Sequence, residues 1–426
     1  MTRLLIRLYG LVDGRERVLA YLVALLTVAA CWAVILASGD RLKSLDEGAF
    51  LALAQNLAGS GSYVEEPGVP TAYRAPGLVF FLTPFAALGL EIVGLRLVNA
   101  ALIGLGLVLV YHLVARRAGP LAGLFATVMI PAWPVVIYAG TTLYPQTLAA
   151  FLLVLTVFAI DRQVVSDRLR GAIWSGIAYA LLLLTIPIVL LLWPIIALYL
   201  LIQTRRKLAH VLVFTLVGGA VVGSWTYRNY VVFDHFIPVA TSSGYNLLAG
   251  NAPNARFDTS LNVRFPEYVY TEITGKSEVE KNDIMTEAAI RLIREDPQRA
   301  AQLYVGKFLH WFDYSNRLLS DDVVEGGASA LAPSKRDMIL LASYLLVIAL
   351  PLVAHVLAAR RHPFTRMELL FVALWVCSGL AYAIFFTRVR FRLPFDWLLI
   401  TSNAMFLAAV IERWIGVQRP PGGPVR

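Results

Sequence analysis

The chain has few charged side chains for its length. Of its 426 residues, 15% are Asp, Glu, Lys or Arg, whereas 58% are hydrophobic. A soluble globular domain carries about 25% charged residues. So few charges cannot solvate the surface of a soluble protein of this size, and we expect the protein to be embedded in a lipid bilayer.

The chain also lacks the motifs of common soluble enzymes. It has only two cysteines, Cys31 and Cys377, and both fall within apolar segments, where a small buried thiol is a better interpretation than a disulfide or a metal ligand. No glycine-rich nucleotide-binding loop and no Cys/His cluster occurs in the sequence. Its positive charges form no basic face interleaved with aromatic residues, so we expect no nucleic-acid partner.

Apolar runs long enough to cross a bilayer recur along the chain. A spanning helix needs about 20 apolar residues, and the short basic runs between apolar segments mark the cytoplasmic side. The sequence predicts ten crossings with both termini in the cytoplasm, at residues 17–37, 92–115, 119–139, 144–161, 171–185, 187–203, 209–227, 337–359, 367–386 and 394–412. Residues 171–203 could instead form one overlong helix, although basic residues at both ends favour a hairpin.

Two extracytoplasmic segments are too long for simple turns. The first, residues 38–91, ends in a 13-residue apolar stretch at 77–89 that is too short to cross and suits an interfacial helix. The second, residues 229–335, contains helix-start signals at Ser277 and at Asp296-Pro297. We therefore divide the chain into an N-terminal membrane module (1–228), an extracytoplasmic loop domain (229–335) and C-terminal membrane helices with a short cytoplasmic tail (336–426).

Asp46 and Glu47 are the most prominent acidic pair in the first outer loop. Ser44 with Glu47 fits a capping box that opens a helix over residues 45–58. In one interpretation, Glu47 is the capping partner and Asp46 complements the helix dipole. In the other, Asp46 faces an outer cavity and acts as a general base. The residues alone leave both open.

A second unusual feature is the arginine cluster Arg388, Arg390 and Arg392. The predicted topology puts it outside, where positive charges are few. On an extended stretch this alternate spacing would aim all three side chains to one side. Guanidinium groups bind phosphate well, so a lipid phosphate would explain the cluster; contact with lipid headgroups or an error in the topology would explain it equally. We expect other arginines at the outer ends of elements to line the same cavity or to pair with Asp46, Glu47 and Glu91, namely Arg74, Arg96 and Arg228.

Several stretches together resemble the GT-C membrane glycosyltransferases. The resemblance is to the branch of protein O-mannosyltransferases and bacterial lipid A aminoarabinose transferases. It is carried, in order, by residues 44–57 (SLDEGAFLALAQNL), 73–82 (YRAPGLVFFL), 143–153 (LYPQTLAAFLL), 224–233 (SWTYRNYVVF), 244–253 (GYNLLAGNAP) and 387–395 (TRVRFRLPF). Each stretch alone is weak, but the ordered set is specific.

The resemblance implies a fold and a reaction. The fold would be an all-α polytopic GT-C-type bundle of about ten transmembrane helices, with interfacial helices in the first outer loop and a small extracytoplasmic helical insertion. The protein would be a monomeric, inverting hexosyl- or pentosyltransferase of the bacterial plasma membrane, taking sugar from a polyprenyl-phosphate donor outside the cytoplasm. The acceptor, a glycan, lipid or protein, is not indicated.

The resemblance also assigns roles to residues. Asp46 matches the family's catalytic base, and Arg388, Arg390, Arg392 and Arg74 would hold the donor phosphate. Substrate-contacting or supporting roles are implied for Glu47, Arg96, Tyr144, Gln146, Arg228, Tyr245 and Asn246. Relatives often carry an acidic residue in place of Gln146, so we assign no cofactor and leave a divalent metal open. The alternatives are a transporter or flippase for a lipid-linked sugar, which needs no base, and a non-catalytic scaffold.

Overall fold

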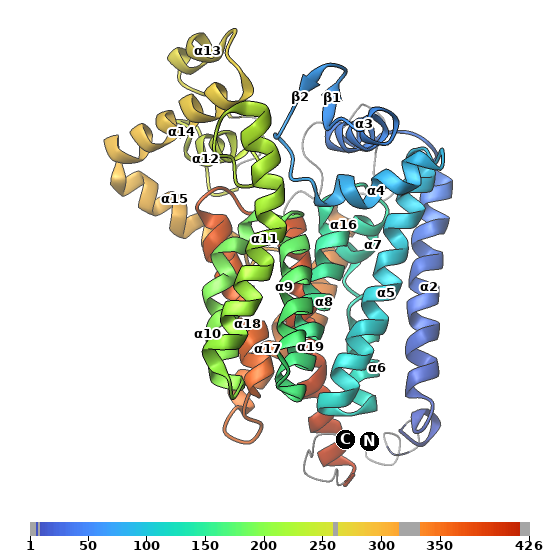
Figure 1. Cartoon of the computed structure of the whole chain (residues 1–426). Coiled ribbons are helices and arrows are strands. Elements are labelled where there is room, and N and C mark those ends of the chain that lie inside the picture. Colours follow the sequence, from blue (N-terminus) through green and yellow to red (C-terminus); the bar gives the residue numbers. More distant parts are fainter. Residues whose placement is uncertain (1–5, 7–8, 259–262, 315–332, 418–426) are drawn as a thin grey trace.

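The computed structural model describes residue 6 and residues 9–258, 263–314 and 333–417. These residues form a bundle of upright helices with a smaller group of helices at one end (Figure 1). We call this end, which carries α3, α4 and α12 to α15, the loop end. The opposite end, where α2 begins and α19 finishes, is the terminal end. The predicted cytoplasmic tail lies outside the described residues from residue 418 onward.

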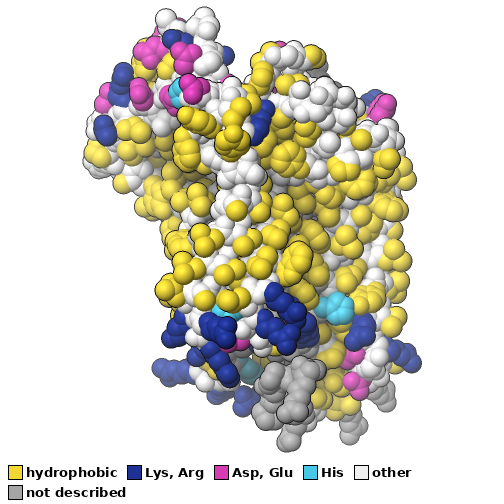
Figure 2. Space-filling view, viewed as in Figure 1, with side chains coloured by type: hydrophobic (Ala, Val, Ile, Leu, Met, Phe, Trp, Pro, Cys, Tyr) yellow, Lys and Arg dark blue, Asp and Glu magenta, His cyan; other side chains and the backbone are white. Residues whose placement is uncertain are grey.

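Seven described helical segments are long and apolar enough to cross a membrane. They are α2 (Glu16–Ser38), α5 (Ile92–Ala118), α8 (Pro145–Ser166), α11 (Lys207–Phe233), residues Lys335–Ala358, α18 (Arg366–Ala383) and α19 (Val389–Trp414). The fifth of these combines α16 (Pro333–Tyr344), a π-helical turn η2 (Leu345–Ala349) and α17 (Leu350–Ala358). Hydrophobic side chains cover the middle of the bundle, and Lys and Arg gather near the terminal end (Figure 2). This distribution agrees with the predicted membrane topology.

The remaining crossings are shorter or broken. Residues 119–139, predicted as one span, form α6 (Pro120–Met129) and α7 (Pro134–Gly140), which are bent by 69°. Pro131 and Pro134 cause the break, because proline lacks the N–H that continues a helix. Residues 171–203 form α9 (Leu169–Leu183), the 3-10 helix η1 (Pro187–Leu192) and α10 (Trp193–Gln203).

A contact at the terminal end confirms the predicted hairpin at residues 171–203. The Arg205 N–H, just beyond α10, donates to the carboxylate of Asp167, just before α9, at 3.1 Å. The start of α9 and the end of α10 therefore lie together, as two antiparallel helices require. The about ten predicted crossings consequently appear as seven long spans, one bent pair and a short hairpin within the described residues.

The central helix of the bundle is α19. Of its apolar window 78% is buried inside the protein, compared with 22% for the peripheral helix α11. Small polar side chains such as Thr401 and Ser402 are buried along it, as expected of a helix surrounded by others. Side chains at the loop end of α19 are therefore held in place by a helix that is packed on all sides.

The first outer loop folds as two helices and a small hairpin. The predicted helices are confirmed as α3 (Leu45–Ser60) and α4 (Gly77–Ala87), and α4 lies across the end of the bundle (Figure 1). Gly61, in the left-handed conformation at φ 70°, ends α3. Between the helices, β1 (Val64–Glu66) pairs antiparallel with β2 (Val69–Pro70), a hairpin that the sequence did not predict.

The second outer segment forms α12 (Ser243–Asn251), α13 (Glu267–Ile273), α14 (Glu278–Glu295) and α15 (Pro297–His310). Both predicted helix starts are confirmed: Ser277 and Glu280 make a complete capping box, and the Asp296 carboxylate accepts the Arg299 N–H at 2.9 Å. Helix α11 continues to Phe233, so the predicted boundary at residue 228 falls within it.

Helix α15 is fastened to the turn between α18 and α19. The Lys307 amine donates to the Phe385 carbonyl at 2.8 Å, and the Thr387 hydroxyl donates to the Lys307 carbonyl at 2.9 Å. Burial lowers the pKa of Lys307 to about 8, and Arg299 adds to the effect. On the other side of the turn, α12 approaches so closely that a Cβ at Gly250 would lie 1.9 Å from the Phe385 oxygen.

We predict that Gly250→Ala destabilises the protein. The added methyl group would overlap a backbone oxygen, and overpacking of this kind costs about 1–3 kcal/mol. Gly219→Ala is the control, because a Cβ at Gly219 meets no atom within 4 Å. Thermal unfolding of the purified protein in detergent should show a lower midpoint for Gly250→Ala and an unchanged or higher midpoint for Gly219→Ala. Equal midpoints would contradict the tight docking of α12.

Candidate functional site

The candidate site begins at the first turn of α3. Ser44 has an extended backbone, and its hydroxyl accepts the Glu47 N–H at 3.3 Å. The predicted capping box is only half present, however: the Glu47 carboxylate accepts the Lys43 N–H at 2.6 Å rather than that of Ser44. Glu47 is turned into the protein, whereas Asp46, one residue earlier, is turned to the loop end.

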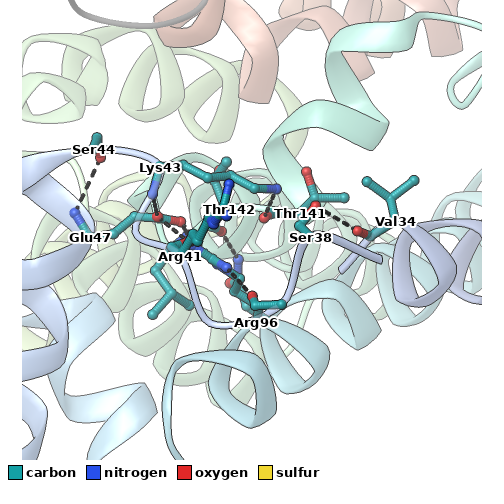
Figure 3. Close-up of polar contacts among 12 residues, drawn as sticks. Val34, Ser38, Arg41, Lys43, Ser44, Glu47, Arg96, Thr141 and Thr142 are labelled. Carbon is teal, nitrogen blue, oxygen red and sulfur yellow. Dashed lines mark hydrogen bonds and ion pairs between the residues drawn. The ribbon is translucent and has the colours of Figure 1, made fainter. Parts of the chain in front are cut away.

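Glu47 is the centre of a fully buried polar cluster (Figure 3). Its carboxylate pairs with the Arg96 guanidinium at 2.6 Å and accepts the Leu143 N–H at 2.9 Å. Arg96 also donates to the carbonyls of Gly39, at 3.1 Å, and Arg41, at 2.8 Å. Among the alternatives that the sequence left open for Arg96, the structure shows the pairing with Glu47. The pair joins α3, α5 and the segment before α8, so its role is architectural.

Lys43 extends this cluster toward the broken span. Its amine donates to the Thr141 carbonyl at 2.8 Å, just beyond α7 (Figure 3). The pKa of the Lys43 amine is lowered to about 8. Burial is the main cause, the positive charge of Arg96 contributes, and the negative charge of Glu47 partly opposes both. Lys43 was not among the predicted site residues. The sequence marks it only as a basic residue in an outer loop, where few basic residues are expected.

Asp46 faces two arginines from distant parts of the chain. Its Oδ1 lies 2.8 Å from Arg74 Nη1, and its Oδ2 lies 4.0 Å from Arg390 Nη2. The Asp46 side chain is one-third exposed, whereas Arg390 is nearly buried. Pairing with an outer arginine was one of the alternatives that the sequence left open for Asp46, and the structure shows it with Arg74. The Arg74 guanidinium also lies over the Phe50 ring, at 5.2 Å from its centre.

The arginines of the last span do not share one face, and that expectation was wrong. The stretch is helical from Val389 onward rather than extended, so successive side chains turn by about 100°. Arg388 is the N-cap of α19, and its guanidinium lies over the Phe386 ring. Arg392 points into the bundle, pairing with Asp396 at 2.9 Å and donating to the Asp313 carbonyl at 2.9 Å. We therefore assign Arg392 to the structure of the bundle.

Arg390 and two residues at the start of α8 carry buried polar atoms that have no hydrogen-bond partner among the described residues. They are Nε and Nη1 of Arg390, the Tyr144 hydroxyl and Oε1 of Gln146. The Arg390 guanidinium lies 4.4 Å above the centre of the Tyr144 ring, and Gln146 follows in the first turn of α8. Buried polar groups are normally paired. A cluster of unpaired groups beside Asp46 is what a binding site for a polar ligand requires.

The structure does not bring the remaining predicted site residues, Arg228, Tyr245 and Asn246, into contact with Asp46. Arg228 donates to the Thr71 carbonyl at 2.9 Å and lies over the Trp225 ring, so it ties α11 to the first outer loop. Tyr245 packs edge-on against Phe265. The Asn246 N–H continues its own helix by donating to the Ser242 carbonyl. None of these contacts reaches Asp46.

Tyr73 lies beside the site, with the Arg74 guanidinium 5.8 Å from the centre of its ring, and it was not among the predicted site residues. Burial raises the pKa of its hydroxyl to about 12; Arg74 opposes the effect, and the nearby Tyr245 and Asp46 add to it. The signal was present in the sequence, since Tyr73 opens the YRAP stretch at residues 73–76.

The residues around Asp46 do not fit a metal site. Across the described ranges, no group of three or more His, Cys, Asp or Glu side chains could hold a metal ion. The cationic groups that face Asp46 are the Arg74 and Arg390 guanidinium groups. We therefore assign no metal ion to the site around Asp46.

Comparison with known proteins gives a partial match in sequence and a broad match in fold. Residues 73–225 match the family model of dolichyl-phosphate-mannose-protein mannosyltransferase. No curated protein sequence matches the chain. The oligosaccharyltransferase of Archaeoglobus fulgidus superposes with a TM-score of 0.57 at 14% identity over 95% of this chain, which spans about half (51%) of that protein's length. The archaeal oligosaccharyltransferase AglB from Archaeoglobus fulgidus, in complex with an inhibitory peptide and a dolichol-phosphate, matches with a TM-score of 0.57 at 14% identity over 94% of this chain and 51% of that one.

A further structure matches over a larger share of its own length. ArnT from Cupriavidus metallidurans aligns with 89% of this chain and 77% of its own, at 17% identity and a TM-score of 0.43. The predicted all-α polytopic architecture is confirmed, and the family match at residues 73–225 confirms the predicted resemblance for the protein mannosyltransferases. The chain is a polytopic helical membrane protein with the fold of the GT-C glycosyltransferases, and its residues 73–225 have the sequence pattern of the dolichyl-phosphate-mannose-protein mannosyltransferases.

Proposed function

We propose that the protein transfers a sugar from a polyprenyl-phosphate donor to an acceptor hydroxyl at the loop end, with inversion at the anomeric carbon. The observation that carries this proposal is the Asp46 carboxylate held between Arg74 and the nearly buried Arg390. Arg390 lies at the loop end of the central helix α19. The match of residues 73–225 to a mannosyltransferase family and the dolichol-phosphate bound by AglB support it.

Asp46 acts as the general base. Arg74 holds Oδ1, which fixes the orientation of the carboxylate and leaves Oδ2 toward the arriving acceptor. As the acceptor oxygen attacks the anomeric carbon, its proton passes to Asp46. The bond between that carbon and the phosphate oxygen breaks, and the phosphate leaves with the electron pair. Attack from the face opposite the leaving group inverts the anomeric centre.

Arg390 stabilises the leaving phosphate. Its Nε and Nη1 have no partner among the described residues, so two donors are available for phosphate oxygens. Such charge-assisted bonds are strongest where water is excluded. The Arg390 guanidinium packs on the Tyr144 ring, and Arg74 places a second positive charge on the same Asp46 carboxylate. Arg392, paired with Asp396, takes no part.

The donor's apolar chain can lie in a groove on the membrane-facing side of α11. The groove has a volume of about 570 Å³ and is lined by α9, η1, α10 and α11. Gly218 and Gly223 open the α11 surface there, and Thr226 and Pro238 border its loop end. Trp225, next along α11, packs on Tyr63, whose hydroxyl donates to the Arg74 carbonyl at 3.0 Å. Contacts through Trp225 and Tyr63 thus connect the segment at the loop end of the groove with Arg74.

The basic terminal end is the cytoplasmic side in this proposal. Arg116, Arg117 and Arg205 lie at that end, as positively charged cytoplasmic segments do. The loop end, with Asp46, then faces away from the cytoplasm of a bacterial plasma membrane. Nucleotide sugars are confined to the cytoplasm, which is consistent with a lipid-phosphate donor.

Asp46→Asn should abolish transfer while leaving donor binding intact. Loss of a general base costs about 10²–10⁴-fold in rate. The assay offers the purified protein polyprenyl-phosphate-linked hexoses and pentoses, and binding is measured with undecaprenyl phosphate. Asp40→Asn is the matched control, because Asp40 is an exposed carboxylate of the same loop. Unchanged transfer by Asp46→Asn, or transport of the lipid-linked sugar without transfer, would favour the flippase alternative.

Arg390→Met should weaken binding of undecaprenyl phosphate. A hydrogen bond to a charged group contributes about 1.5–3 kcal/mol, so we expect roughly a 10- to 100-fold higher Kd. Arg390→Lys should have a Kd between those of the unmodified protein and Arg390→Met, since lysine keeps the positive charge but lacks the planar set of guanidinium donors. Arg256→Gln, at an exposed position of the outer segment, removes the same charge as a control. An unchanged Kd for Arg390→Met would remove Arg390 from the phosphate site.

Glu47→Gln should unfold the protein far more readily than Asp46→Asn. Breaking a buried ion pair from one side costs about 3–5 kcal/mol, and Arg96 would be left uncompensated at a fully buried position. The partly exposed pair of Asp46 and Arg74 is worth about 1 kcal/mol or less. Thermal unfolding of the two variants tests this, and a larger loss for Asp46→Asn would reverse the assigned roles.

A further inference from the structure

Glu278 of the second outer segment binds the first outer loop. Its carboxylate accepts the Thr71 hydroxyl at 2.6 Å, the Ala72 N–H at 2.8 Å and the Thr241 hydroxyl at 2.6 Å. Thr71 and Ala72 follow the β1–β2 hairpin, and Thr241 precedes α12. One carboxylate thus joins three segments that are far apart in the sequence.

The bound segment leads directly to the proposed site. The Thr241 N–H donates to the Ala72 carbonyl at 3.0 Å, and the Tyr73 N–H donates to the Thr71 hydroxyl at 3.0 Å. The next residue is Arg74, whose guanidinium holds Asp46 at 2.8 Å. Residues 71–73 have no helix or strand of their own, so hydrogen bonds to other segments, including those of Glu278, determine their position.

The start of α14 does not itself require Glu278. Ser277 and Glu280 already supply both halves of the capping box, with Glu280 accepting the Ser277 N–H at 2.9 Å. A carboxylate at the first position of a helix also complements the dipole, but that effect needs no partner outside the helix. All the hydrogen bonds of Glu278 given above go to other segments, which a purely local role leaves unexplained.

We propose that Glu278 is a positioning residue that fixes Arg74 against Asp46 and so makes the second outer segment part of the catalytic unit. This inference rests on the proposed function. Glu278 touches neither Asp46 nor Arg74; it holds the backbone two to three residues before Arg74. Loosening that backbone lets the Arg74 guanidinium move away from Oδ1, and the base loses its orientation.

The test compares Glu278→Ala with Glu280→Ala in the full-length protein. Both variants remove one carboxylate from the first turn of α14, but only Glu278 binds residues 71–72. We expect Glu278→Ala to lower kcat about tenfold or more with the KM for the donor within about twofold. Glu278→Gln, which keeps an acceptor oxygen, should recover part of the rate. Glu280→Ala should transfer at the normal rate even though it loses the capping box.

A double-variant comparison shows whether the effect passes through Arg74. In an Arg74→Ala background, adding Glu278→Ala should lower kcat no further. A further tenfold loss in the double variant would overturn the inference, because Glu278 would then act by another route. Equal kcat values for Glu278→Ala and the unmodified protein would overturn it as well.

Amide hydrogen exchange gives a readout that needs no sugar transfer. Glu278→Ala should speed exchange at Ala72 and Tyr73 about tenfold or more, with Glu280→Ala leaving them unchanged. If no donor supports transfer by the unmodified protein, the proposed function fails and the exchange result still reports the contact. If exchange rises but transfer does not fall, the proposed function stands and the positioning role is refuted.

Discussion

The buried pair of Glu47 and Arg96 supports the whole loop end. Both side chains are fully buried, and their desolvation is offset by bonds to Lys43, Leu143, Gly39 and Arg41. Through these contacts the first turn of α3, the end of α2, the start of α5 and the start of α8 share one polar centre. If either partner were replaced by a neutral side chain, these four segments would lose the contacts that hold them together. The candidate site, which is built on them, would lose its support.

Asp46 acquires its exposed position from this buried neighbour. Consecutive residues on a helix point about 100° apart, so fixing Glu47 toward the bundle turns Asp46 toward the loop end, where Arg74 and Arg390 meet it. The central helix α19 presents Arg390 at its first turn, and the contacts of Lys307 and Arg392 hold that turn in place. Two adjacent carboxylates thus serve different purposes, one in the architecture and one in the proposed chemistry.

Much of the fold could be predicted because the bilayer imposes a length on each apolar run. The break at Pro131 and Pro134 was readable in principle, since proline interrupts helices. The pairing of Asp46 with an outer arginine was one of the alternatives that the topology left open. The helical start of α19 could not be read, because alternating arginines fit a strand and a helix end alike. Burial of Glu47 and the contacts of Glu278 depend on segments about 50 to 200 residues away, and only the folded chain brings them together.

The bend between α6 and α7 has a consequence for how the protein can change over evolution. Where α7 ends near the bundle's loop end, backbone carbonyls are left outside the helical pattern, and Thr141 and Thr142 offer theirs to Lys43 and Asn99. A carbonyl belongs to every residue type, so these acceptors persist whatever side chain occupies the two positions. The interrupted span therefore gives Lys43 and Asn99 two acceptors that substitution of Thr141 or Thr142 themselves does not remove.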